Sequence, residues 1–279
     1  MALVFQQGST LLMDTGSVVR RFLISEASVS QTYQEERRSI RTIHNKNQIE
    51  DTFTNSKGEA SVEFTVYLTK EDGVLLSWFG MGTLEPYKFF PDPFKEPLPF
   101  DLYLVSNGAL YKVSNVYCRT LSFNMSKSNP LSVSVSATGS NWEEVQSIPS
   151  VTESQESSLF KVGSISGIED LAGISLELTR SIDWRNTKYL QNALEGEIYT
   201  PQKITSENYS ISGTITKYKK DDSLSHSIEG LVEFTYGDLI EVRLEPCKLL
   251  DRWETGDVHR KMTDFMALPN LTNSFIHFI

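Results

Sequence analysis

The sequence predicts a mainly β fold, arranged as two tandem β-sandwich or barrel domains with at most one short helix in each. Three observations predict this fold: strand-like alternation in many segments, an internal repeat, and a polar stretch between the repeated halves. The chain has 279 residues, of which 39% are hydrophobic, and this is enough to form substantial cores in two domains of ordinary size.

Strand patterns dominate because apolar residues recur at every second position, as they do along a strand with one buried face. Between Ser61 and Thr69, one face of the predicted strand carries Val62, Phe64, Val66 and Leu68. The same alternation predicts strands at residues 131–136, at 174–179 with an extension through Ile182 and Trp184, and at 209–216. Residues 231–244 predict a hairpin with its turn at 236–238.

One segment has helical spacing instead. Residues 71–80 begin with two acidic residues and end with glycine, and Val74, Leu75, Trp78 and Phe79 fall on one helical face. Residues 86–99, which follow, contain five prolines among aromatic residues. This composition predicts a long irregular loop with apolar anchors.

The two halves align with each other at constant differences in residue number. Residues 60–66 match 209–215, and 29–33 match 178–182, both at a difference of 149. Further on, Gly108 matches Gly237 and Cys118 matches Cys247 at a difference of 129. The difference in residue number changes from 149 to 129 at the predicted helix and proline loop, so the second half should have a shorter segment there.

This repeat predicts a duplicated domain. We expect a first domain at residues 1–145 with the helix and a proline-rich loop insertion, a polar linker at 146–168, and a second domain at 169–279 with an apolar C-terminal tail. The tail, residues 275–279, should close its own domain or pack on a neighbour. The alternative is a single elongated β domain with similar strands.

The charge and the cysteines narrow the environment. A formal net charge of −10 argues against tight phosphate binding, although a polyanion could slide past such a surface. Cys118 and Cys247 are far apart in the sequence, which favours buried free thiols in a reducing compartment. No apolar stretch is long enough for a membrane span, and the N-terminus does not resemble a secretory signal.

Motifs for catalysis, cofactors or metals are absent from the sequence. The four histidines do not occur at metal-ligand spacing, and there is no HExxH, CxxC, GxSxG, Walker A or GxGxxG motif. We therefore predict no enzymatic activity, no cofactor and no metal. The alternative from another class is a carbohydrate-binding or hydrolytic β-sandwich that uses an exposed tryptophan such as Trp142 or Trp253.

The order of elements resembles the tube domain of bacteriophage tails. The resemblance begins with an alternating strand that runs into a polar loop, at residues 29–41. A second strand (60–68), a helix (71–79) and two closing strands (110–118 and 121–126) follow. The resemblance covers most of both halves, although the second half lacks a clear helix after its second long strand.

The resemblance implies a structural protein of the virion tail, assembled in the host cytoplasm. Six tube domains close a ring around a channel, so that the partners are further copies of this chain in hexameric or trimeric pseudo-hexameric rings that stack. Sheath or baseplate proteins bind outside, and viral DNA passes through the lumen without specific binding. The main tail tube is the first expectation, and a baseplate hub, tube initiator or tail terminator is the alternative.

The resemblance also assigns contact residues. The polar loop of the first half and its counterpart in the second are candidates for contacts between rings and subunits: Arg37, Arg38, Arg41, Lys46 and Asp51, then Arg185, Asn186, Lys188 and Tyr189. The proline loop, present in one half alone, is the candidate for sheath or baseplate contacts through Phe89, Phe90 and Phe94. A solvated surface of mixed charge is the alternative for any one of the charged residues.

Overall fold

The computed structural model confirms a mainly β chain. It describes residues 2–5, 10–42, 45–106, 108–126, 129–154, 164–168, 170–185, 203–218, 224, 226–254, 259–268 and 273–279. Its helical elements are a 3-10 turn (Lys70–Gly73) and α1 (Val74–Phe79).

Strands make up most of the remainder. In the first half they are β1 (Ala2–Phe5), β2 (Thr10–Asp14), β3 (Val19–Phe22), β4 (Ile24–Thr42), β5 (Asn45–Tyr67), β6 (Gly82–Glu85), β7 (Lys88–Phe90), β8 (Phe100–Ser106), β9 (Ala109–Ser126), β10 (Ser132–Gly139) and β11 (Asn141–Glu144). They continue with β12 (Glu153–Ser154), β13 (Ile165–Ser166), β14 (Leu171–Arg185), β15 (Lys203–Tyr218), β16 (His226–Tyr236), β17 (Ile240–Glu254), β18 (Arg260–Ala267) and β19 (Phe275–Phe278).

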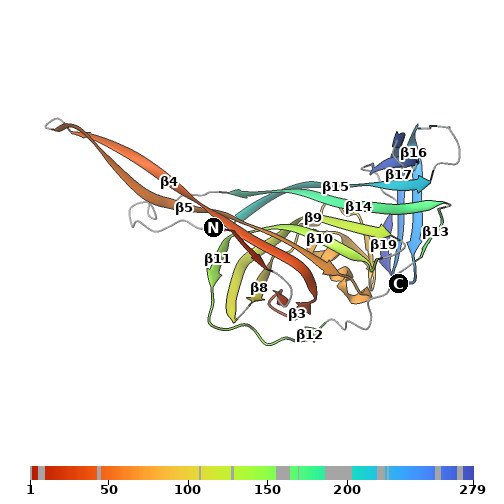
Figure 1. The fold of residues 1–279 in the computed structure, drawn as a ribbon, viewed down its shortest axis with the longest axis horizontal. Helices are drawn as coiled ribbons and strands as arrows, with labels where there is room; N and C mark the ends of the chain where they lie inside the picture. The colour runs from red at the N-terminus through yellow and green to blue at the C-terminus, as the bar shows by residue number, and fades with distance from the viewer. Residues whose placement is uncertain are drawn as a thin grey trace.

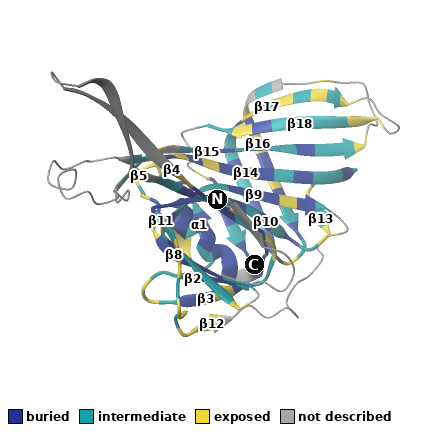
Figure 2. Cartoon of the chain, turned by 60° about the vertical axis from the view of Figure 1, so that its left-hand side comes forward, coloured by how far each residue is buried: buried dark blue, intermediate teal, exposed yellow. Residues whose placement is uncertain are grey.

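Eight of these strands form one antiparallel run that extends through both halves of the chain. Its order is β4-β5-β10-β9-β14-β15-β18-β17 (Figure 1 and Figure 2). β9 and β14 are the neighbours at the middle of the run, so the two halves share one sheet.

A second layer folds over the first half of this sheet. β9 is long enough to serve both layers, because its start pairs with β8 and β11 while its end pairs with β10 and β14. β2 continues the second layer from β8, and β3 continues it from β2. Helix α1 lies against this layered body, and the buried residues of Figure 2 follow the interior faces.

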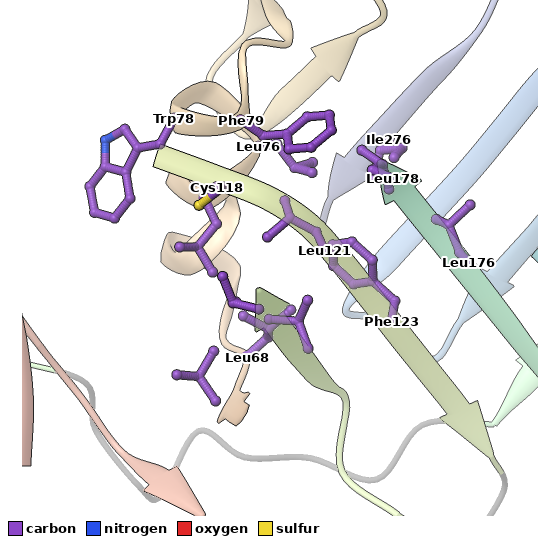
Figure 3. Close-up of a cluster of buried hydrophobic side chains, with 14 of the residues drawn as sticks. Leu68, Leu76, Trp78, Phe79, Cys118, Leu121, Phe123, Leu176, Leu178 and Ile276 are labelled. Carbon is purple, nitrogen blue, oxygen red and sulfur yellow. The ribbon is translucent and has the colours of Figure 1, made fainter. Parts of the chain in front are cut away.

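The core crosses the boundary between the halves. Leu76 and Phe79 of α1 are buried with Leu121 and Phe123 of β9, and Leu176 and Leu178 of β14 extend the same cluster (Figure 3). Ile276 of β19 also joins it. Because this one cluster contains residues of both halves, the core does not mark a boundary between two domains. The two-domain division with boundaries at 145 and 169 stays a prediction.

The predicted helix is confirmed, and its ends have a physical basis. The Asp72 carboxylate accepts hydrogen bonds from the backbone N–H of Thr69 at 2.6 Å and from its hydroxyl at 2.8 Å, which caps the first turn. Gly80 ends the helix with a φ of 102°, a left-handed conformation that glycine adopts without strain. No helix follows β15 in the described residues of the second half, where 219–223 and 225 lie outside the description.

The strand pairings reproduce the offset found in the sequence. Val29 lies opposite Val62 in the β4–β5 pair, and Leu178 lies opposite Ile211 in the β14–β15 pair. Both members of the pair are shifted by 149. Each ladder then breaks at the same place, after Gln31 in β4 and after Arg180 in β14. The halves therefore share register and irregularity as well as strand order.

A compensating exchange in the two cores supports the same correspondence. Phe64 of β5 lies opposite Val135 of β10, and at the corresponding place Gly213 of β15 lies opposite Phe265 of β18. The large side chain has moved to the neighbouring strand. A Cβ at Gly213 would clash with the Phe265 ring and with the carbonyl oxygen of Ser175.

The cysteines confirm buried free thiols. Cys118 and Cys247 are both fully buried and unbonded to each other. Burial raises the pKa of the Cys118 thiol to about 12. It also raises the pKa of the Cys247 thiol to about 11, with a smaller contribution from Glu245.

Three local expectations need correction or completion. The polar loop after residue 29 is a β-hairpin, because β4 and β5 stay paired out to Thr42 and Asn45. Part of the proline loop is also regular, since β7 pairs with β6 and with β19. The apolar tail closes its own chain: β19 lies between β17 and β7, and Ile276 and Phe278 are buried.

Substituting Gly213→Ala should lower the free energy of unfolding by about 2–3 kcal/mol, because the added methyl group meets a backbone carbonyl and a packed ring. Urea unfolding measures the change. The matched control is Ser212→Ala on the opposite face of the same strand, which should change the value by less than about 0.5 kcal/mol. Equal effects of the two substitutions would contradict the packing described for Gly213.

Candidate assembly surfaces

The eight-strand sheet has one apolar face in the core and one face rich in hydroxyl groups. Serine and threonine alternate with buried residues along β4, β5, β10, β9, β14 and β15 of this sheet, including Ser28, Ser61, Thr65, Ser134, Thr120, Ser122, Ser175, Ser212 and Thr214. Thr65 and Ser134 join neighbouring strands by a 3.0 Å hydrogen bond. Small hydroxyl side chains give a smooth polar surface without deep apolar anchors.

Two shallow grooves mark this hydroxyl-rich face. One, of about 370 Å³, lies over the first half between Glu26, Glu63 and Ser136. The other, of about 630 Å³, lies over the second half and includes Glu177 and Lys248. Acidic groups outnumber basic ones around the two grooves. The acidic residues are Glu26, Glu63, Glu177 and Asp264, and the basic ones are Lys248 and the nearby Arg252.

Arg252 is already paired within the chain. Its Nε donates to Asp264 at 2.7 Å, and Asp264 also accepts a 2.7 Å hydrogen bond from Thr214. Burial opposes the charged form of Asp264, but the hydrogen bonds from Arg252 and Thr214 outweigh it and lower the pKa of this carboxyl group. The side chain of Arg252 remains about half exposed, at 52%.

The joint between the halves combines strand pairing with polar contacts. β9 and β14 pair over seven positions, from Ser126–Gly173 to Thr120–Thr179. Beside this ladder Arg119 donates a 2.9 Å hydrogen bond to the carbonyl of Ile182, and it also forms a two-point ion pair with Glu59. The indole of Trp184 donates to Thr138 at 2.8 Å.

Arg180 fastens the second half to the helix of the first. Its guanidinium lies 5.4 Å from the ring of Phe79 and 5.0 Å from that of Tyr209, and it donates a 3.2 Å hydrogen bond to the Lys95 carbonyl. The residue is only 4% exposed, and burial lowers the pKa of the guanidinium. A Cβ at Gly80 would lie 2.8 Å from this group, so glycine is needed there for space as well as for its conformation.

A second buried arginine fixes the start of the helix. Arg20 of β3 lies 2.7 Å from Asp72, the helix-capping carboxylate, and 2.9 Å from Glu153 of β12. The network ties the end of the second layer, α1 and the predicted linker together. Pairing of a buried arginine with a carboxylate reduces the cost of removing both charges from water.

The predicted charged contact residues lie on a long arm or beyond the described chain. Arg37, Arg38 and Arg41 are on β4, and Lys46 and Asp51 are on β5, where the two strands leave the body as a projecting ribbon (Figure 1). Within this ribbon the backbone of Arg38 lies opposite that of Asp51. Arg185 ends β14 opposite Lys203, while Asn186, Lys188 and Tyr189 lie outside the described residues.

The three phenylalanines of the proline loop have different environments. Phe89 is 4% exposed and packs edge-on against Phe278 at 6.4 Å, so it fixes β19 in the core. Phe90 is partly buried, whereas Phe94 is 93% exposed. A groove of about 910 Å³ lies near this loop, with Trp78, Tyr87 and Leu98 among its lining residues. An outside partner would therefore meet Phe94 and not Phe89.

The described residues do not assemble an arrangement for metal chemistry. Among them, no group of three or more His, Cys, Asp or Glu side chains could hold a metal ion. The helical part of the described chain contains nothing long and apolar enough to cross a membrane. What the arrangement provides is a polar sheet face, strand edges, an arm and an exposed loop, which are surfaces for assembly.

Sequence reasoning did not identify the two buried arginines. Arg20 and Arg180 are ordinary members of strands that otherwise alternate, and their partners lie far away in the sequence. One signal was available for Arg180: the repeat places it over Gln31, a buried residue whose amide donates a 2.9 Å hydrogen bond to the Gly58 carbonyl. Both halves thus place a buried polar side chain where the strand ladder breaks.

Comparison with known proteins places this architecture in context. The model of the bacteriophage baseplate tube protein family matches residues 3–279. Baseplate tube protein p140 of Escherichia phage T5 is 22% identical over 206 residues, which cover 70% of this chain and 68% of that protein. The family match extends across both halves of the sheet, the arm and the C-terminal strand.

Substituting Arg180→Ala should lower the free energy of unfolding by about 2 kcal/mol, because it removes a desolvated cation from two aromatic rings and leaves a space beside Gly80. Urea unfolding followed by the fluorescence of the tryptophans, which include buried Trp78, measures the loss. The matched control, Ser181→Ala at the next and exposed position, should be neutral. A neutral Arg180→Ala would show that this contact does not hold the halves together.

Proposed function

The chain belongs to the bacteriophage baseplate tube protein family, and from that premise we propose that three copies close a pseudo-hexameric ring around a DNA-conducting channel. The family gives the protein a structural role in the tail of the virion. The proposal adds the stoichiometry, the wall and the contacts. It assigns the protein no catalytic step and no cofactor.

The observation that supports this proposal most strongly is the repeated strand register. Each half contributes four neighbouring strands in the same order, β4-β5-β10-β9 and β14-β15-β18-β17, and the β4–β5 and β14–β15 ladders share their register at a difference of 149. Two equivalent units in one chain supply six units in a trimer. A closed ring also satisfies the backbone groups of every edge strand, which an open sheet leaves unpaired.

The joint inside the chain provides a template for the joint between chains. β9 of the first half pairs with β14 of the second, so β17 of the second half should pair with β4 of the next copy. β17 occupies in the second half the place that β9 occupies in the first. Leu121 of β9 lies opposite Val135 of β10, and Leu249 of β17 lies opposite Phe265 of β18, so Leu249 corresponds to Leu121. Asn124, which lies opposite Ser175 in the chain, then corresponds to Arg252 opposite Glu26 of the next copy.

This juxtaposition is complementary in charge. Arg252 is half exposed and Glu26 is exposed at the two outer edges of the sheet. Opposite charges directly across a strand pair stabilise it by roughly 0.2–1 kcal/mol, and like charges oppose it. The same pairing would place the hydroxyl-rich face on the channel wall, where its acidic groups repel the phosphates of passing DNA.

The arm and the exposed loop take the remaining contacts in this proposal. The β4–β5 ribbon, with Arg37, Arg38, Arg41, Lys46 and Asp51, reaches the neighbouring ring, and Arg185, Lys188 and Tyr189 of the second half face the same ring. Phe94 contacts a baseplate or sheath protein on the outside. Because the family is named for the baseplate, we place the ring in the baseplate section of the tube, with the main tail tube as the alternative. Assembly takes place in the host cytoplasm.

Electron microscopy of the purified protein tests the ring directly. Class averages should show a central channel and six similar lobes that alternate in shape, so that the true symmetry is three-fold. Single rings or short stacks would agree with a baseplate location, whereas long uniform tubes would favour the main tail tube. A strictly monomeric protein at high concentration would refute the proposal.

A charge exchange tests the pairing of β17 with β4. Glu26→Arg or Arg252→Glu alone should raise the concentration needed for half-maximal ring formation several-fold, because each places like charges across every joint between chains. The double variant should restore the value toward that of the wild type, as measured by sedimentation velocity. Arg243→Glu, on the same strand but away from the joint, serves as the control. Failure of the double variant to recover, while urea unfolding shows an intact fold, would contradict this register.

A further inference from the structure

Both outer edges of the eight-strand sheet are partly covered by the chain's own strands. At one end, β1 pairs antiparallel with residues 27–30 of β4, on the edge opposite β5. At the other end, the start of β16 pairs with β17 from Cys247 to Leu250, on the edge opposite β18. These edges are the ones that the proposed ring would join, so the following inference rests on that proposal.

β1 occupies the place on β4 that β9 occupies on β14. In the joint inside the chain, residues 176–179 of β14 lie opposite Phe123 to Thr120 of β9. The repeat carries residues 176–179 onto 27–30, and there β1 places Phe5 to Ala2 opposite the same four positions in the same antiparallel direction. Leu3 and Phe5 thereby take the positions of Leu121 and Phe123, so β1 copies the register of a neighbouring tube strand and its apolar residues at these two positions, although Val4 replaces Ser122.

The covering of β17 has a cause in the sequence. In the first half, β8 separates from β9 beyond the Phe100–Val116 pair, and the residues before it include Pro91, Pro93, Pro97 and Pro99. Proline cannot donate a backbone hydrogen bond to a ladder, so this segment leaves the edge of β9 open for β14. The corresponding strand of the second half, β16, has no proline at 226–236 and stays paired with β17.

Within the described residues, each edge keeps an end that pairs with no further strand, and these two ends correspond. Residues 251–254 of β17 pair with β18, and no described strand pairs with their other edge. Residues 24–26 of β4 pair with β5, and β1 does not reach them. In the register of the proposed joint, Arg252 of one copy meets Glu26 of the next, so the first contact can form where no described strand pairs with either edge.

We propose that β1 is a displaceable cap that holds the ring-forming edge of β4 closed in the isolated chain, and that a second copy of the chain removes it by strand exchange. The incoming β17 pairs first with residues 24–26, then extends along β4 and takes the place of β1. The start of β16 leaves β17 in the same step, because both cannot occupy residues 247–250. Each backbone hydrogen bond that β1 gives up is replaced by one to the neighbour.

Such a cap serves two purposes. It covers an exposed strand edge, which would otherwise pair with any extended chain and aggregate. It also makes ring closure depend on a partner with the correct register and the complementary charge of Arg252. Assembly then starts at the open ends, where charge complementarity acts before the cap has moved.

A reversible tether tests the cap. Leu3 lies opposite Val29 in the β1–β4 ladder, so the variant Leu3→Cys with Val29→Cys should fasten β1 to β4 when oxidised and release it when reduced. Native Cys118 and Cys247 are buried and do not compete. A matched pair, Lys112→Cys with Glu143→Cys, fastens β11 to β9 away from both outer edges. Mass photometry of oxidised and reduced samples measures the fraction of chains in rings.

The cap predicts that the oxidised tether abolishes rings, that reduction restores them, and that the matched pair forms rings in both states. If the fraction of chains in rings is the same for the oxidised and the reduced tether variant, the cap is overturned, whereas the proposed ring is not contradicted. If the reduced tether variant also forms no rings, a chain without residues 1–6 gives the deciding measurement. Ring formation by this chain at or below the protein concentration that the wild type needs supports the cap, and a need for a higher concentration overturns it. Absence of rings from the wild type as well would overturn the proposed function and the cap together.

Discussion

The antiparallel pairing of β9 with β14 is the interaction on which the rest of the structure depends. It turns two four-stranded units into one sheet with a hydroxyl-rich face and an apolar face. The apolar face needs cover along its whole length, and the core that provides it, from α1 to β19, therefore belongs to both halves. Arg180 and Arg119 add directional contacts on either side of the same joint. A sheet made in this way ends in β4 on one side and β17 on the other, and the proposed ring joins these two edges.

The two halves differ in structure where they contact different neighbouring elements. The first half carries α1 and the proline loop, and Arg180 of the second half packs against the end of that helix. At the position of buried Phe123 the second half has Asp251, which accepts a 2.7 Å hydrogen bond from Thr263 and pairs with Lys261 at 2.9 Å. A position that holds a buried apolar side chain in the first half thus holds a charged side chain in the second half. The proposed trimer would present each kind of surface three times, so that a baseplate partner with three-fold symmetry would distinguish them.

Much of the fold could be predicted from the sequence, because period-two alternation reports directly which side chains share a face. Val62 to Leu68, the helix before Gly80 and the repeat offset were all readable in this way. Contacts between distant segments were not. Phe89 and Phe278 have no local pattern that pairs them, and the arm was misjudged as a loop because its largely polar sequence shows no regular alternation of apolar residues. Arg20 and Arg180 became recognisable only once their carboxylate and aromatic partners were located in space. The division into domains, the ring contacts of the arm and the role of Phe94 remain predictions.

The most direct test of the account is a cysteine cross-link between copies. The proposed ring repeats the register of the β9–β14 joint and therefore places Leu250 of one copy opposite Ser28 of the next, while the same two residues lie on strands at opposite ends of the sheet within one chain. Oxidation of the variant Ser28→Cys with Leu250→Cys should therefore give covalent dimers and trimers on a denaturing gel, with the closed trimer as the largest species. Moving one cysteine by two positions, to Ser30, should reduce the yield sharply. Products that continue beyond the trimer, or no cross-link at all under conditions in which rings form, would contradict the closure of a ring by β17 and β4.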